Sequence, residues 1–158
     1  MENGYAGIFR SKGEKMLKEF ISNFTEELPE GHIWKKGRKY FLVDKEHTLK
    51  PQYTGIFLGL IGKGFHPSLW LLHWLKSRTK KKLMVDKKGE WMFICGKDIF
   101  KSSIKRRFKI GKSDTILVLN QYQECLGYGV FQDRKKVAVK NVFDIGDFLR
   151  REKVTKKK

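Results

Sequence analysis

A series of short apolar segments separated by turns limits how the second half of this chain can fold. Asp, Gly and Lys residues fill the intervals, as in the turn predicted at residues 86–89. The segments recur at roughly 8–12 residues, which is typical of short strands in a small barrel. We predict strands at residues 83–85, 90–95, 108–110, 115–119, 126–131 and 136–142. Residues 96–100 read as a short helical turn, and Asp144 as the cap of a last helix over residues 145–151.

The first half of the chain mixes helical and strand patterns. Residues 11–24 carry one apolar stripe at helical spacing, formed by Met16, Leu17, Phe20, Ile21 and Phe24. Residues 33–43 predict a hairpin whose tip, residues 35–39, is basic. Residues 53–61 predict a buried strand.

A second helix is predicted over residues 68–76, with Pro67 at its first turn and with Leu69 and Leu72 buried. We therefore expect an α+β protein. A small α/β domain would occupy residues 1–80, a mainly β pseudo-barrel residues 81–152, and a basic tail residues 153–158.

The charge balance points to a polyanionic partner. The chain has 158 residues, with 35 Lys and Arg against 17 Asp and Glu, and a formal net charge of +18. The charge grows along the chain, from +2 over residues 1–43 to +6 over 44–90 and +10 over 91–158. Apolar residues make up 40%, too many for a disordered basic tail. The charge allows DNA, RNA or an acidic membrane surface as the partner, and the absence of a long apolar run excludes a membrane-spanning helix.

The search for reactive groups finds no recognisable catalytic, metal or cofactor site. Cys95 and Cys125 form no paired metal motif, and we expect Cys95 to be a buried thiol at the end of a strand. His66 and His73 lie seven residues apart without a carboxylate at ligand spacing. Neither phosphate-loop nor dinucleotide-binding glycine motifs occur. We therefore expect no enzymatic activity and no cofactor.

Five segments carry a resemblance to a known family. Residues 90–104, from Glu90 through the Gly96 corner to Ile104, resemble the opening of a PUA domain, an RNA-binding module. Residues 125–130 and 136–151 resemble its later strands and closing helix. Together with residues 53–59 and 67–69, they make the chain similar to the Nip-seven family of ribosome-biogenesis factors. The resemblance implies a pre-PUA domain followed by a PUA domain.

The resemblance implies an RNA-binding surface at the glycine corner and at the closing strand and helix. The candidate residues are basic: Lys97, Lys101, Lys105, Arg106, Arg107, Lys140, Arg150, Arg151, Lys153 and Lys156. Arg150 and Arg151 rank first, because guanidinium groups bind phosphate in a bidentate manner. Trp91 and Phe93 are expected to pack in the core rather than to meet bases.

The family implies a non-enzymatic RNA-binding factor in ribosome biogenesis or rRNA processing. An alternative is an adaptor or accessory subunit of an RNA-modifying complex for methylation or pseudouridylation. In that case aromatic residues of the first domain would dock a protein partner: Trp34, Tyr40, Phe41, Trp70 and Trp74. Because the first residues show no secretory signal, we expect a cytoplasmic location, or a nucleolar one in a eukaryotic host.

Overall fold

A computed structural model describes residues 11–44, 55–147 and 150 of the chain. The chain divides into two compact units, Met1–Arg78 (unit 1) and Thr79–Lys158 (unit 2), and each is described by itself. Within the described ranges, no helix has the length and apolar character needed to cross a membrane. The predicted basic tail lies outside the described residues.

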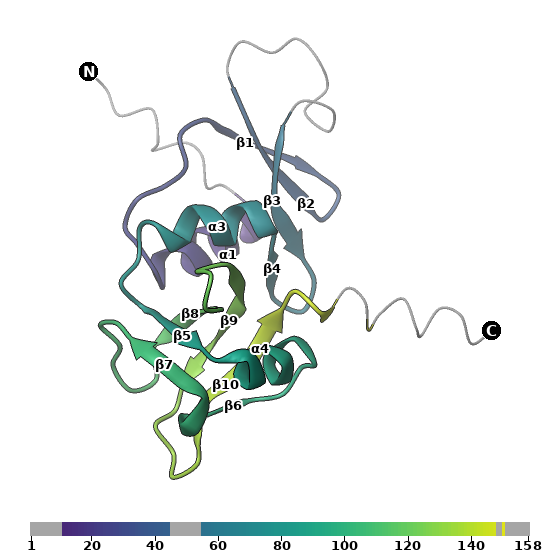
Figure 1. The fold of residues 1–158 in the computed structure, drawn as a ribbon. Coiled ribbons are helices and arrows are strands. Elements are labelled where there is room, and N and C mark those ends of the chain that lie inside the picture. Colours follow the sequence, from purple (N-terminus) through teal and green to yellow (C-terminus); the bar gives the residue numbers. More distant parts are fainter. Residues whose placement is uncertain (1–10, 45–54, 148–149, 151–158) are drawn as a thin grey trace, which may run out of the picture. The chain divides into compact units, whose positions relative to one another are not determined.

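Unit 1 combines an antiparallel sheet of order β1-β2-β3-β4 with helices α1 and α3 (Figure 1). Phe20 of α1 packs against Phe65 of β4, with ring centroids 5.2 Å apart. The elements are α1 (Lys12–Ser22), β1 (His32–Lys36), β2 (Lys39–Val43), β3 (Ile56–Ile61), β4 (Phe65–Pro67) and α3 (Leu69–Lys76). The mixed α/β character predicted for this part of the chain is confirmed.

Helix α1 confirms the helix predicted from the apolar stripe. Ser11 is its N-cap and accepts a hydrogen bond from the Glu14 N–H, while the Glu14 carboxylate accepts one from the Ser11 N–H. This capping box satisfies two of the amide groups that every helix start leaves open. Leu17, Phe20 and Ile21 are the residues of the helix that are buried.

The hairpin and the second helix follow the predictions in outline. Lys36 pairs with Lys39, so Gly37 and Arg38 form the turn of the β1–β2 hairpin. Ser68 caps α3, and Pro67 ends β4 instead of entering the helix. The expectation for Leu69 is wrong, because this side chain is 62% exposed. The helix turns its Leu71, Leu72 and Leu75 face inward.

Unit 2 is a curved sheet of order β6-β10-β9-β8-β5-β7. The β5–β8 pair is parallel and the other pairs are antiparallel. The elements are β5 (Lys82–Val85), α4 (Lys87–Ile94), β6 (Ile99–Phe100), the 3-10 turn η1 (Lys101–Ser103), β7 (Ile104–Arg107), β8 (Thr115–Leu119), β9 (Cys125–Phe131) and β10 (Val137–Asp144). Because η1 joins the two edge strands directly, the sheet is a nearly closed pseudo-barrel, as predicted.

The interior of the pseudo-barrel holds one apolar cluster to which α4 contributes Phe93. The other members come from the strands: Leu83, Val85, Ile99, Ile116, Val118, Leu126, Phe131, Ala138 and Val139. The strands predicted at residues 115–119, 126–131 and 136–142 are therefore confirmed as β8, β9 and β10.

The turn predicted at residues 86–89 and the strand predicted at 90–95 are both wrong. These residues form the cap and body of helix α4, whose N-cap Asp86 accepts a hydrogen bond from the Gly89 N–H at 2.8 Å. A short unbroken apolar run has neither strand nor helix period, so tertiary packing decides its conformation. Phe93 is fully buried, whereas Trp91 is 66% exposed and points away from the core.

Two further predictions in unit 2 are wrong. The helical turn predicted at residues 96–100 lies later in the chain. Ile99 and Phe100 pair with β10 as β6, and the helical turn η1 follows at Lys101–Ser103. The strand predicted at 108–110 lies earlier, at Ile104–Arg107, where it pairs with β5. Backbone pairing with β5 makes the basic residues 105–107 part of the strand, although their side chains are exposed.

The helical assignment of α4 predicts unequal effects at two neighbouring aromatic residues. Phe93→Ala should lower the free energy of unfolding by about 3–5 kcal/mol, because it opens a cavity in the core. Trp91→Ala should change it by no more than about 0.5 kcal/mol, because the ring is solvent-facing. Urea titrations followed by far-UV circular dichroism measure both. Similar losses for the two variants would contradict the helix, since a strand would place both rings on one face.

Candidate nucleic-acid interface

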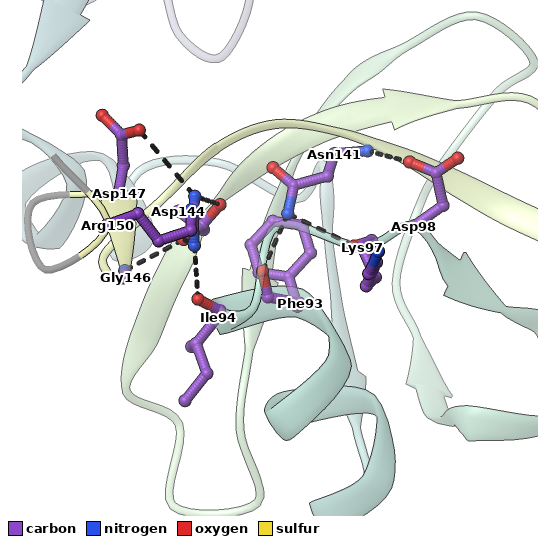
Figure 2. Close-up of polar contacts among 9 residues, drawn as sticks. All are labelled: Phe93, Ile94, Lys97, Asp98, Asn141, Asp144, Gly146, Asp147 and Arg150. Carbon is purple, nitrogen blue, oxygen red and sulfur yellow. Dashed lines mark hydrogen bonds and ion pairs between the residues drawn. The ribbon is translucent and has the colours of Figure 1, made fainter. Parts of the chain in front are cut away.

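The connection between α4 and β6 is a rigid corner. Asn141 of β10 donates its side-chain amide to the Phe93 carbonyl at 2.8 Å and to the Lys97 carbonyl at 3.3 Å. Its backbone N–H donates to the Asp98 carboxylate at 2.9 Å (Figure 2). One residue of the sheet thus donates to the Phe93 carbonyl, which also accepts the Cys95 and Gly96 N–H groups, and to the Lys97 carbonyl in the following loop.

Arg150 closes the same corner from the C-terminal side. Its Nη1 donates to the Ile94 carbonyl at 2.6 Å and to Asp144 Oδ1 at 2.9 Å, and its Nη2 donates to Asp144 Oδ2 at 2.8 Å (Figure 2). Asp144 is only 2% exposed. The hydrogen bond to Asp144 raises the pKa of Arg150. The guanidinium group is therefore bound within unit 2. We call this contact of Arg150 with Asp144 and the Ile94 carbonyl the clamp.

Gly96 leaves room for this clamp. Its φ is +81°, in the left-handed region that favours glycine, and a Cβ there would lie 3.2 Å from the Arg150 guanidinium carbon. A side chain at this position would be strained and would press on the guanidinium. The backbone conformation and the nearby Arg150 thus explain why glycine suits position 96.

The solvent side of the corner is basic and carries one large aromatic residue. Lys97 in the loop and Lys140 on β10 are exposed. On α4, Lys87 and Lys88 lie four and three positions before Trp91, so the three side chains share the outer helical face. We call Lys87, Lys88, Trp91 and Lys97 the α4 face. An exposed ring flanked by ammonium groups is the combination that binds unpaired bases and their phosphates.

A second basic surface follows the edge strand β7. Lys105, Arg106 and Arg107 are all exposed there. The Arg106 guanidinium carbon lies 4.7 Å from the centroid of the Phe108 ring, and that of Arg107 lies 4.5 Å from the Phe131 ring. Aromatic contacts of this kind hold a guanidinium in place and leave its N–H edges open for a phosphate.

One carboxylate lies within this second surface. Lys101 Nζ forms an ion pair of 2.8 Å with Asp133. The hydrogen bond and charge of Lys101, together with the charges of Arg107 and Lys112, lower the pKa of Asp133. The carboxylate therefore stays ionised at neutral pH and offsets part of the Lys101 charge.

The predicted RNA-binding residues fall into three groups. Lys97, Lys101, Lys105, Arg106, Arg107 and Lys140 are exposed basic residues of unit 2. Arg150 belongs to the clamp, and Arg151, Lys153 and Lys156 lie outside the described residues. The sequence interpretation missed the α4 face, because Trp91 was placed on a strand. The signal was Asp86, an N-cap residue followed by Glu90 in the first helical turn.

The candidate reactive groups of the sequence are its histidines, cysteines and carboxylates. No group of three or more His, Cys, Asp or Glu side chains there is arranged to hold a metal ion. Cys125 is partly exposed. The expectation that Cys95 is a buried thiol is wrong: it is exposed, because α4 ends there at the surface.

The clamp predicts that Asp144 contributes more to stability than an exposed carboxylate. Asp144→Ala removes the buried carboxylate that accepts from the Arg150 guanidinium and from the Gly146 N–H, and should cost about 1.5–3 kcal/mol of unfolding free energy. Asp133→Ala is the matched control and should change stability little, because its ion pair with Lys101 is solvent-exposed. Equal midpoints for the two variants in urea titration would refute the clamp.

Comparisons with known proteins agree on the class of unit 2. Residues 81–153 match the family model described as the UPF0113 PUA domain. A UPF0113 protein of Archaeoglobus fulgidus is 32% identical over 114 residues, covering 66% of this chain and 66% of that protein. The chain thus spans just under two thirds of the length of this curated relative.

Solved structures share the fold at low sequence identity. A conserved PUA domain protein from Thermoplasma acidophilum superposes with a TM-score of 0.59 at 17% identity, covering 87% of this chain and 92% of that one. A PUA domain from Aeropyrum pernix K1, solved as a tartrate complex, gives 0.57 at 15% identity, covering 88% and 85%. The PUA class is an RNA-binding class. The match over residues 81–153 makes this part of the chain similar to UPF0113 PUA domains, and the described residues of unit 2 share the PUA fold.

Proposed function

We propose that this protein binds RNA through its PUA domain and acts as a non-enzymatic factor in ribosome biogenesis or rRNA processing. The observation that carries the proposal is the α4 face, where Trp91 stands exposed beside Lys87 and Lys88 on a helix anchored to the pseudo-barrel. The exposed indole face is accessible for stacking on a base.

The α4 face supports recognition of an unpaired base. A base stacking on the Trp91 ring would contribute about 1–3 kcal/mol, with little dependence on its identity. Lys87, Lys88 and Lys97 would contact the flanking phosphates, because their ammonium groups share the exposed side of the helix and its corner. Single-stranded regions present such splayed bases, whereas paired A-form helices hide them.

The basic strand β7 would hold the RNA backbone rather than its bases. Arg106 and Arg107 already use their planar faces on Phe108 and Phe131, so their edges remain for phosphate oxygens. Lys105 adds a third cation on the same strand. Such contacts orient the RNA and carry no sequence information.

The narrower role in ribosome assembly rests on the resemblance to the Nip-seven family. The alternative, an adaptor in an RNA-modifying complex, needs an aromatic docking surface on unit 1. Tyr40 is 1% exposed and Phe41 is 9% exposed, so these two rings belong to the core of that unit. Trp34, Trp70 and Trp74 are partly exposed, so these three rings remain the candidates for a docking surface.

Substitution of Trp91 tests the α4 face directly. Trp91→Ala should weaken binding of a fluorescein-labelled oligouridine about tenfold or more, because stacking is lost. Trp91→Phe should recover part of the affinity, since an aromatic face remains. Tyr122→Ala is the matched control, because Tyr122 is 75% exposed on a loop whose neighbour Glu124 is acidic. Fluorescence anisotropy at fixed salt measures all three.

Salt dependence separates stacking from charge at the same face. The double variant Lys87→Ala with Lys88→Ala should reduce the slope of log K against log[salt] by about 1.4, at roughly 0.7 for each single-strand phosphate contact. Trp91→Ala should leave the slope unchanged while lowering K. If neither the affinity for oligouridine nor its salt dependence changes in these variants, the α4 face is not part of the interface.

The cellular role predicts which RNA the protein contacts. Ultraviolet crosslinking in the source cell, followed by sequencing of the bound RNA, should recover pre-rRNA, and the yield should fall in the Trp91→Ala variant. Enrichment of modified small RNAs or guide RNAs instead would support the adaptor role. Absence of any RNA crosslink at native expression would contradict both roles.

A further inference from the structure

Unit 1 contains a basic pocket that the PUA interface does not use. The pocket has a volume of about 360 Å³, and four cationic residues line it: Lys12, Lys35, Arg38 and Lys63. They come from the start of α1, from the tip of the β1–β2 hairpin and from the turn between β3 and β4. No carboxylate residue is part of its lining among the described residues.

Tyr40 supplies a second, independent observation at this pocket. The residue lines the pocket and is only 1% exposed. Its hydroxyl lies against Gly13 on the pocket wall, so closely that a Cβ at Gly13 would overlap it. No described residue forms a hydrogen bond with this hydroxyl, and its oxygen is not among the fully buried polar atoms without a partner. The oxygen is therefore accessible from the pocket that Tyr40 lines. A hydroxyl in such a position needs water or a ligand as its partner.

The backbone adds to the positive potential of the pocket. Lys12 and Gly13 are the first two residues of the 11-residue helix α1, whose N-terminal end carries a partial positive charge. The capping box engages Ser11 and Glu14, and the amide groups of Lys12 and Gly13 have no intrahelical acceptor. Four cations confined to one hollow repel one another, and an anion with several oxygens relieves this repulsion.

We propose that this pocket binds a phosphate monoester. Arg38 suits bidentate contact with two phosphate oxygens, while Lys12, Lys35 and Lys63 act as point charges around it. The Tyr40 hydroxyl donates a hydrogen bond to the same group. The volume is sufficient for a nucleotide-sized ligand. A free nucleotide and the 5′-phosphorylated end of an RNA share this chemistry.

Calorimetric titration of the full chain tests the pocket with defined probes. Adenosine 5′-monophosphate should bind and adenosine should not, and inorganic phosphate should compete with the nucleotide. Lys35→Ala with Arg38→Ala should lower the affinity at least about tenfold, since each removes a charge-assisted contact. Tyr40→Phe keeps the buried ring and should lower the affinity several-fold, with an unchanged circular dichroism spectrum.

The hairpin offers a control with the same change in net charge. Lys36→Ala with Lys39→Ala removes two cations from the same tip, but neither residue lines this pocket. This variant should bind adenosine 5′-monophosphate as the parent protein does. If both double variants lose the same affinity for adenosine 5′-monophosphate, the loss reflects the net charge of the hairpin and not the pocket. That result would overturn the proposal.

Oligonucleotides distinguish the two sources of the phosphate. A 5′-phosphorylated oligouridine that binds more tightly than its 5′-hydroxyl counterpart, with the difference lost in Lys35→Ala with Arg38→Ala, assigns the pocket to an RNA end. Nucleotide binding without that difference assigns it to a free nucleotide. Failure of nucleotide, phosphate and RNA end alike overturns the proposal. The proposed role of the α4 face is judged separately, by the response to Trp91→Ala.

Discussion

The PUA domain depends on how the open C-terminal end of α4 is paired. The carbonyls of Ile94 and Lys97 accept side-chain N–H groups, as does that of Phe93 beside its backbone donors Cys95 and Gly96, and a helix end without partners is costly. Asn141 and Arg150, both distant in sequence, supply the donors. These bonds join α4 and its corner to β10 and to the segment that follows it. The burial of Phe93 and the exposure of Trp91 are two consequences of this attachment.

Several acidic residues of the PUA domain accept hydrogen bonds that hold its fold together. Asp86 caps α4, Asp98 holds the backbone of Asn141, and Asp144 holds Arg150. Asp114 caps a turn at the Gly111 N–H and pairs with Lys81 at 3.6 Å. Since these carboxylates are placed by the fold, the exposed lysines of α4 and β10 dominate the outer potential. The exposed positive charge of this unit is therefore arranged by the same contacts that stabilise the pseudo-barrel.

Sequence patterns predicted the elements whose periodicity or capping is unambiguous. The stripe of α1, the β1–β2 hairpin and the later strands β8, β9 and β10 all carry such patterns. The segment at 90–95 does not, because six residues of mainly apolar character suit either a strand or a helix. That one ambiguity also misplaced Trp91, and with it the most exposed aromatic side chain of the candidate interface on α4. Arg150 was ranked by its chemistry alone, whereas Asp144 and the Ile94 carbonyl decide where its guanidinium points.

The sequence by itself determined the amount of positive charge and its distribution along the chain. Net charge and its increase toward the C-terminus follow from composition, and the glycine corner follows from a local motif. Tertiary structure alone decided which cations are gathered into one place, because Lys12, Arg38 and Lys63 become neighbours only when α1 and the two turns fold together. It also decided which aromatic side chain meets solvent, because burial depends on the face that packing selects rather than on residue type.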